Sequence, residues 1–126
     1  MAKTVMIVDD SYSLRRMVQA TLSDAGYEVI EAVDGRDALT KLNSSSARVH
    51  LIISDMNMPV MDGITFVKEV KTHPTYKSTP VMMLSTEGAT EKKLMGREAG
   101  AKAWMVKPFL PQQMLNAVAM LVSCAR

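Results

Sequence analysis

Short apolar segments alternate with segments of helical periodicity along the chain, and this alternation constrains the fold more than any other feature. The apolar segments are rich in β-branched residues and methionine and end at polar residues or turns, as strands do. We expect five strands, at residues 4–8, 27–32, 49–53, 81–84 and 103–106. Strands that alternate with helices pair in parallel, so the chain predicts an α/β fold with one parallel sheet covered by helices on both faces.

The segments between the strands carry the signals that start and stop helices. Ser11 is a good N-cap and Gly26 a natural end for the first helix, and Pro111 suits the first turn of the last. The fourth helix is more polar than the others, with Leu94 and Met95 as its main apolar residues. We expect the five helices at about residues 12–25, 35–42, 63–72, 90–99 and 111–122, with a polar loop at 43–46.

The composition limits the classes of partner and compartment. A chain of 126 residues is long enough for one domain with its own core. Its charges are interspersed and sum to a formal net charge of only +2, so nothing favours nucleic-acid binding. The lone Cys124 excludes an internal disulfide and fits a reducing compartment. The sequence has no signal-peptide region and no apolar run of membrane-spanning length, so we expect a cytoplasmic protein without membrane insertion.

Polar side chains stand at the ends of four of the predicted strands. Asp9 and Asp10 follow the first strand, and Asp55 follows the third after Ser54. Ser85 follows the fourth strand and Lys107 the fifth. The carboxyl ends of parallel strands meet at one edge of the sheet, where ligands bind in such folds, so we expect these side chains to lie together.

The chemistry of this group points to phosphoryl transfer. Carboxylates brought into contact repel one another by about 4 kcal/mol per pair at an intermediate dielectric, so the cluster needs a cation. Oxygen ligands with no Cys or His nearby favour a hard divalent ion, and Mg²⁺ suits a small open site. Lys107 adds an ammonium and Ser85 a hydroxyl donor. A metal, an ammonium and a hydroxyl around Asp55 are what transfer of a phosphoryl group to that carboxylate requires.

These motifs resemble the receiver domain of two-component response regulators, and most of all the single-domain chemotaxis regulators of the CheY type. The resemblance covers the whole chain, 1–126, as one receiver domain. It implies a doubly wound, flavodoxin-like sheet of strand order 2-1-3-4-5. The residues that carry it are Val8-Asp9-Asp10, Asp55-Met56-Asn57-Met58-Pro59 with Asp62-Gly63, Ser85 and Lys107-Pro108-Phe109.

The resemblance implies a phosphoacceptor and a set of metal ligands. Asp55 would take a phosphoryl group from the phosphohistidine of a histidine kinase. Mg²⁺ would be bound by the carboxylates of Asp10 and Asp55, by the backbone carbonyl of Asn57, and by Asp9 mainly through water. No other cofactor is implied. We expect a signalling phosphoprotein that catalyses its own phosphorylation and dephosphorylation, and not an enzyme that turns over a small-molecule substrate.

The resemblance also implies how phosphorylation would reach a partner. Lys107 would pair with Asp55 and then with its phosphoryl oxygens, and Ser85 would donate to the phosphoryl group and draw its loop inward. Trp104 would report that movement by turning inward. The peptide between Lys107 and Pro108 resembles a position that is cis in the family.

Several residues depart from the family pattern on the expected output face. Thr86 follows Ser85 at a position where the family often has a smaller residue. Trp104 replaces the Tyr that is common in proteins that bind the flagellar switch. The fourth helix is basic on this face, with Lys92 and Lys93. The expected partners are a histidine kinase, a downstream protein target, for which the flagellar motor switch is one candidate, and a phosphatase.

Three alternative functions have to be weighed against this one. A phosphohydrolase of the haloacid dehalogenase type needs an acid two residues after the nucleophile, and Asn57 cannot serve as one. A flavodoxin-like FMN carrier needs a phosphate-binding loop after the first strand, where Asp9 and Asp10 would repel phosphate in the absence of a metal. The third alternative is a receiver that serves as a phosphate sink or adaptor and does not act on the flagellar motor.

Overall fold

The computed structural model of the chain describes residues 2–45, 48–86 and 90–124. Along these residues strand and helix alternate as the sequence predicts. The strands are β1 (Thr4–Val8), β2 (Glu28–Ala32), β3 (Leu51–Asp55), β4 (Val81–Ser85) and β5 (Ala103–Val106). The helices are α1 (Tyr12–Asp24), α2 (Gly35–Ser44), α3 (Gly63–Thr72), α4 (Thr90–Ala99) and α5 (Pro111–Cys124).

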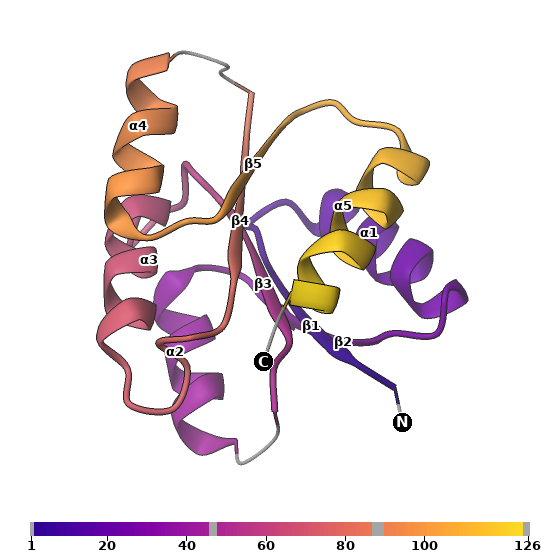
Figure 1. Cartoon of the computed structure of the whole chain (residues 1–126), viewed down its shortest axis with the longest axis horizontal. Helices are drawn as coiled ribbons and strands as arrows, with labels where there is room; N and C mark the ends of the chain where they lie inside the picture. The colour runs from indigo at the N-terminus through magenta and orange to yellow at the C-terminus, as the bar shows by residue number, and fades with distance from the viewer. Residues whose placement is uncertain (1, 46–47, 87–89, 125–126) are drawn as a thin grey trace.

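The strands form one parallel sheet in the order β2-β1-β3-β4-β5. Helices α1 and α5 cover one face of the sheet, and α2, α3 and α4 cover the other (Figure 1). The predicted fold class and the strand order implied by the resemblance are therefore confirmed. This order places β1 and β3 side by side, at the point where the winding of the chain reverses and where sheets of this kind bind ligands.

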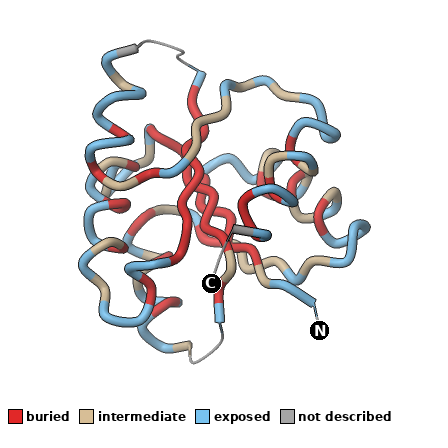
Figure 2. Tube along the Cα trace, in the orientation of Figure 1, coloured by how far each residue is buried: buried red, intermediate tan, exposed pale blue. Residues whose placement is uncertain are grey.

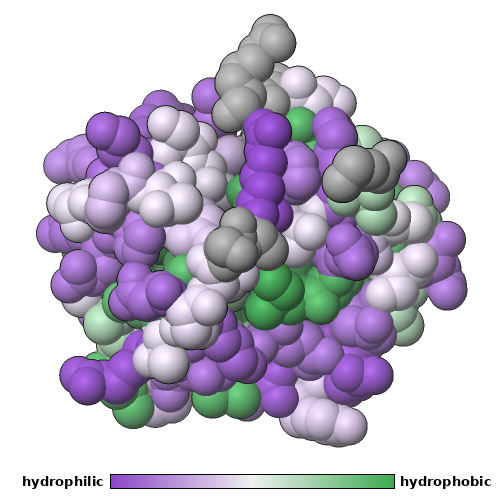
Figure 3. Space-filling view, turned by 90° about the horizontal axis from the view of Figure 1, so that it is seen from below, coloured by the Kyte–Doolittle hydropathy of each residue, from purple (hydrophilic) through white to green (hydrophobic). Residues whose placement is uncertain are grey.

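The strands occupy the buried centre of the molecule (Figure 2). Every residue of β3 and β4 is buried, because helices pack against both faces of the sheet. The strands run upward in Figure 1, so Figure 3 looks at their amino ends, where polar side chains surround a smaller apolar area. Within the described part of the chain, no helix has both the length and the apolar character needed to cross a membrane.

The ends of the helices follow from their capping residues. The Ser11 side chain accepts a hydrogen bond from the backbone N–H of Leu14 and so begins α1. Asp34 and Asp62 cap α2 and α3 in the same way. After α1 the chain turns at Gly26, whose φ of +95° lies in the region that favours glycine.

Several predicted boundaries differ from the observed ones by one or two residues. The central strand begins at Leu51 instead of residue 49, and it continues to Asp55. Asp55 is still in register with β4, so backbone pairing extends the strand two residues beyond its apolar run. Helix α2 continues to Ser44, past its predicted end at Leu42. The last residue of the predicted polar loop, Ser46, lies outside the described residues.

The fourth helix has the predicted bounds but buries other residues than its apolar pair. Leu94 and Met95 are 48% and 54% exposed. The described residues that α4 buries are Gly96 and Ala99, whose small size brings the helix close to the sheet. The ring of Trp104 fills the remaining space, and a Cβ at residue 96 would lie only 3.1 Å from that ring.

Candidate functional site

Three carboxylates meet where β1 and β3 end. Asp9 and Asp10 directly follow β1, and Asp55 is the last residue of β3. Each offers an oxygen atom, and these atoms all lie within 4.8 Å of one another. Asp9 and Asp55 are buried whereas Asp10 is exposed, so the cluster is open to solvent on the Asp10 side. The structure thus brings together the three acidic residues that the sequence predicted to meet.

Lys107 extends from the end of β5 to the same cluster. Its Nζ atom lies 2.9 Å from Oδ2 of Asp9 and 3.1 Å from Oδ1 of Asp55. Its backbone N–H donates to the carbonyl of Ser85 at the end of β4. The peptide between Lys107 and Pro108 is cis, as the resemblance implied. The ammonium therefore pairs with two of the three carboxylates.

The electrostatics of the site reflect an excess of negative charge. Burial raises the pKa of Asp55, and repulsion from Asp9 raises it further, while the hydrogen bond from Lys107 opposes both effects. Burial by itself would lower the pKa of Lys107, but its hydrogen bonds and attraction to Asp9 and Asp55 outweigh burial and raise it. One ammonium does not compensate three carboxylates. A hard divalent cation with oxygen ligands would complete the compensation, so the donor set fits such an ion.

The remaining predicted residues lie around the cluster. The backbone N–H of Asn57 donates to the Asp55 carboxylate, and the Asn57 side chain is exposed. Ser85 is fully buried at the end of β4, and Thr86 after it is exposed. A cavity of about 150 Å³ next to Asn57 is also lined by Lys92 of α4. Ser85 and Asn57 therefore border the end of the sheet at which the acidic cluster lies.

Trp104 and Lys93 lie together on the other side of α4. They line a small pocket of about 70 Å³ with Arg97 and Lys102. The indole ring is packed inward against Gly96, and its Nε1 atom is buried without a hydrogen-bond partner among the described residues. The structure therefore places Trp104 and Lys93 at a separate pocket from the one that Lys92 lines.

Sequence reasoning missed Arg15, which contacts the backbone of the site. The guanidinium of Arg15 donates to the backbone carbonyl of Asp9 over 2.7 Å, and the residue is only 8% exposed. A signal for it was present in the sequence. Arg15 precedes Val18 and Leu22 at helical spacing, so a charged residue stands on the apolar face of α1.

Comparison with known protein families identifies the same family as the motifs. The chain matches the sequence model described as the response regulator receiver domain over residues 5–119. It is 40% identical to chemotaxis protein CheY1 of Helicobacter pylori over 109 residues, and this alignment covers 86% of this chain and 87% of that protein. It is 37% identical to protein PilG of Pseudomonas aeruginosa over 114 residues, and this alignment covers 90% of this chain and 83% of that protein.

Solved structures agree with the observed fold. Chemotaxis protein CheY4 of Vibrio cholerae superposes with a TM-score of 0.91 at 50% identity, covering 96% of this chain and 99% of that one. A response regulator from Chloroflexus aurantiacus superposes with a TM-score of 0.90 at 35% identity, covering 98% and 99%. The similarity extends over nearly the full length of each chain.

Proposed function

The chain belongs to the response regulator receiver domain family, and on that premise we propose that Asp55 is the residue on which it accepts a phosphoryl group. Its similarity to chemotaxis proteins is consistent with a phosphorylatable signalling switch of a two-component system in chemotaxis. The observation that carries the assignment to Asp55 is the arrangement at the ends of β1 and β3. There a buried carboxylate lies within reach of two others and of the ammonium of Lys107.

The acidic cluster is of the kind at which receiver domains bind Mg²⁺. We infer that Asp10 and Asp55 would ligate the ion through their carboxylates, Asn57 through its backbone carbonyl, and Asp9 mainly through water. All of these ligands are oxygen atoms, as Mg²⁺ prefers. When bound, the ion would offset the repulsion among the carboxylates and the charge on the transferred phosphoryl oxygens.

The protein's own residues would divide the chemistry among them. A carboxylate oxygen of Asp55 forms the new bond to phosphorus while the bond from phosphorus to the donor's imidazole nitrogen breaks, and the electron pair of that bond stays on the nitrogen. The raised pKa of Lys107 keeps its ammonium charged at neutral pH, so it can pair with the phosphoryl oxygens as they approach. Ser85 would donate its hydroxyl to the same group.

We infer the surroundings of the switch from the same premise. Membership of the family implies a kinase as phosphodonor and a downstream protein target. We propose that residues 1–126 form one receiver domain that catalyses its own phosphorylation, that it acts in the cytoplasm, and that a phosphatase resets it. Output would pass through Thr86, Trp104, Lys92 and Lys93 to a chemotaxis partner, for which the flagellar motor switch is the first candidate to test.

Labelling with a small phosphodonor tests the assignment of Asp55. The purified chain is incubated with acetyl phosphate, with and without Mg²⁺, and its intact mass is measured. We expect the wild-type chain to gain one phosphoryl group only with Mg²⁺, and Asp55→Asn to gain none, because the amide lacks the attacking oxygen. Asp62→Asn is the matched control, since it alters a nearby aspartate but preserves the cap of α3. Equal labelling of Asp55→Asn and wild type would overturn the assignment.

A further inference from the structure

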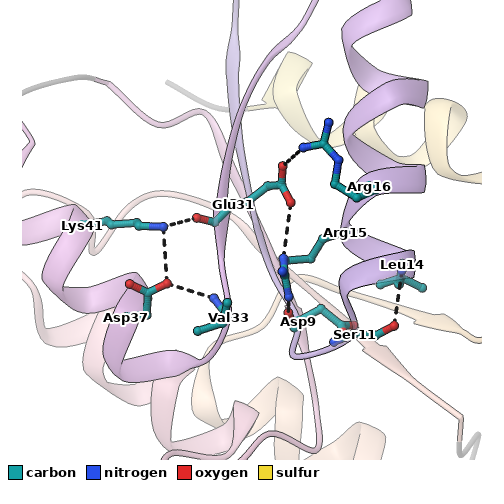
Figure 4. A network of polar contacts seen from close by, with 9 residues as sticks. All are labelled: Asp9, Ser11, Leu14, Arg15, Arg16, Glu31, Val33, Asp37 and Lys41. Atoms are coloured by element: carbon teal, nitrogen blue, oxygen red, sulfur yellow. Dashed lines mark hydrogen bonds and ion pairs between the residues drawn. The ribbon is translucent and has the colours of Figure 1, made fainter.

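Arg15 is a buried cation on the face of α1 that packs against the sheet. Removing a guanidinium from water is costly unless its donors find partners. Arg15 has two such partners (Figure 4). Its Nε atom lies 3.3 Å from Oε1 of Glu31 on β2, and its Nη1 atom donates to the backbone carbonyl of Asp9 over 2.7 Å. The side chain therefore joins α1 to β2 and to the end of β1.

The bond to Asp9 bears directly on the acidic cluster. The carbonyl that Arg15 contacts belongs to the peptide that joins Asp9 to Asp10, so the bond fixes the orientation of that peptide. Both Asp9 carboxylate oxygens also have partners: the backbone N–H of Ser11 donates to Oδ1 over 2.8 Å, and Lys107 donates to Oδ2. The backbone N–H of Asp9 donates to the Ala32 carbonyl, so Arg15 holds the carbonyl side of this residue, and Ser11 and Lys107 hold its carboxylate.

Glu31 holds the guanidinium in this orientation. One of its carboxylate oxygens accepts from Arg15, and the other lies 2.6 Å from Nη1 of Arg16. The Arg16 side chain is 50% exposed, and its guanidinium points away from Asp9 (Figure 4). The two neighbouring arginines therefore share an anchor, but the bond to the Asp9 carbonyl comes from Arg15. Arg16 is consequently a matched control within the chain.

We propose that Arg15 is a positioning residue for the acidic site, which holds the Asp9–Asp10 peptide so that both carboxylates face Asp55, with Glu31 as its anchor. The inference rests on the proposed function, because the reaction that it supports is Mg²⁺-dependent phosphorylation of Asp55.

The sign of one measurement separates positioning from a simple effect of charge. Arg15 brings a positive charge close to a site that would bind a cation. Removal of that charge alone should strengthen Mg²⁺ binding, because an opposing field disappears. Loss of the bond to the Asp9 carbonyl should weaken Mg²⁺ binding, because the ligands are no longer aligned. Partners that orient metal ligands typically change metal affinity by about 10- to 100-fold, so we expect weakening in that range.

The experiment is calorimetric titration of Mg²⁺ into the full chain, with urea unfolding to establish that each variant is folded. We expect Arg15→Ala to bind Mg²⁺ at least tenfold more weakly, and Arg16→Ala to bind as wild type or slightly more tightly. The Mg²⁺ concentration that gives half-maximal labelling by acetyl phosphate should rise by the same factor in Arg15→Ala. Wild-type or tighter binding by Arg15→Ala would overturn the proposal. An effect on labelling without a change in affinity would also overturn it.

Two milder variants test the proposal if Arg15→Ala fails to fold. In Arg15→Lys a single ammonium cannot reproduce the forked contact with both Asp9 and Glu31, so affinity should fall by a smaller factor. Glu31→Gln leaves the guanidinium in place but weakens its anchor. The Mg²⁺ affinity of this variant should lie between those of wild type and Arg15→Lys. Wild-type affinity in both variants would refute positioning. A wild-type chain that neither binds Mg²⁺ nor becomes labelled would instead refute the proposed function.

Discussion

Val60 has the most unusual backbone of any single residue near the acidic site. It follows Pro59 in the loop after β3, its φ is +71°, and its side chain is 72% exposed. A β-branched residue is strained in this region, at a cost of about 1–3 kcal/mol. An asparagine at position 60 would adopt this backbone conformation with less strain than valine, because its short polar side chain tolerates the left-handed region.

Replacing Val60 with Asn should stabilise the protein. Relief of the strain should raise the free energy of unfolding by about 1 kcal/mol, measured by urea denaturation without Mg²⁺. Val33→Asn is the control, since Val33 is also an exposed valine but has no positive φ. Equal changes in the two variants would show that the gain comes from removing exposed apolar surface and not from the backbone.

His50 makes the pairing of β1 with the start of β3 sensitive to acid. The Nδ1 atom of His50 accepts a hydrogen bond from the backbone N–H of Thr4 over 3.1 Å, and the backbone N–H of His50 donates to the Thr4 carbonyl. Burial lowers the pKa of His50 below its ordinary value of 6.5, and the charges of Arg48 and Lys3 lower it further. The folded state therefore binds this proton less readily than the unfolded state.

Linkage gives the sign of the pH dependence. The stabilisation from neutral His50 is fully present above the unfolded pKa of 6.5, and it is lost as the pH falls through the lower pKa of the folded state. We expect the urea midpoint to fall between about pH 7.5 and pH 5.5, and to fall less in His50→Asn, which keeps an acceptor but does not titrate. Identical pH profiles for the two proteins would contradict this role.

At the scale of elements, the contact between α4 and β5 depends on a single glycine. Gly96 lies in the helix interior, where alanine would be preferred by about 1 kcal/mol on propensity alone. Here a Cβ would lie 3.1 Å from the Trp104 ring, which is closer than ordinary contact. The glycine thus provides the space in which the indole packs inward.

Gly96→Ala should displace the indole towards solvent. Because Trp104 is the one tryptophan in the sequence, its fluorescence reports this directly, as a red-shifted emission that is more easily quenched by acrylamide. Glu98→Ala, at an exposed position of the same helix, should leave the emission unchanged. The smaller ring in Trp104→Phe reduces the clash. In that background, adding Gly96→Ala should raise the free energy of unfolding by up to about 1 kcal/mol. An unshifted spectrum would contradict the packing described.

Comparison of the elements shows where sequence patterns succeed and where they fail. The bounds of α3, α4 and β5 follow from apolar periodicity and from the glycines and prolines that end each segment, because both signals are local in the chain. The burial of α4 could not be predicted, because it depends on an indole from β5 that fits against Gly96. The extension of β3 from residue 53 to Asp55 was not predicted for a similar reason, since it is set by pairing with β4.

At the scale of the whole molecule, topology made the site predictable. In a parallel sheet all strands end at the same edge, so the sequence alone predicts that Asp9, Asp55 and Lys107 meet there. The place of Arg15 on the apolar face of α1 indicated that it is buried, but its partner could not be predicted. Arg15 donates to a backbone carbonyl, and every residue has one. No residue type in the sequence therefore identifies the Asp9 carbonyl as its partner.

Chemical trapping can identify the residue that carries the phosphoryl group, which we propose to be Asp55. An aspartyl phosphate is an acyl phosphate, which borohydride reduces to homoserine, whereas a free carboxylate does not react. After treatment with acetyl phosphate, Mg²⁺ and borohydride, peptide sequencing by mass spectrometry should find homoserine at position 55 and unchanged aspartate at positions 9, 10 and 62. Homoserine at any of those three positions, or unchanged aspartate at position 55 in a chain that has gained a phosphoryl group, would show that Asp55 is not the phosphoacceptor.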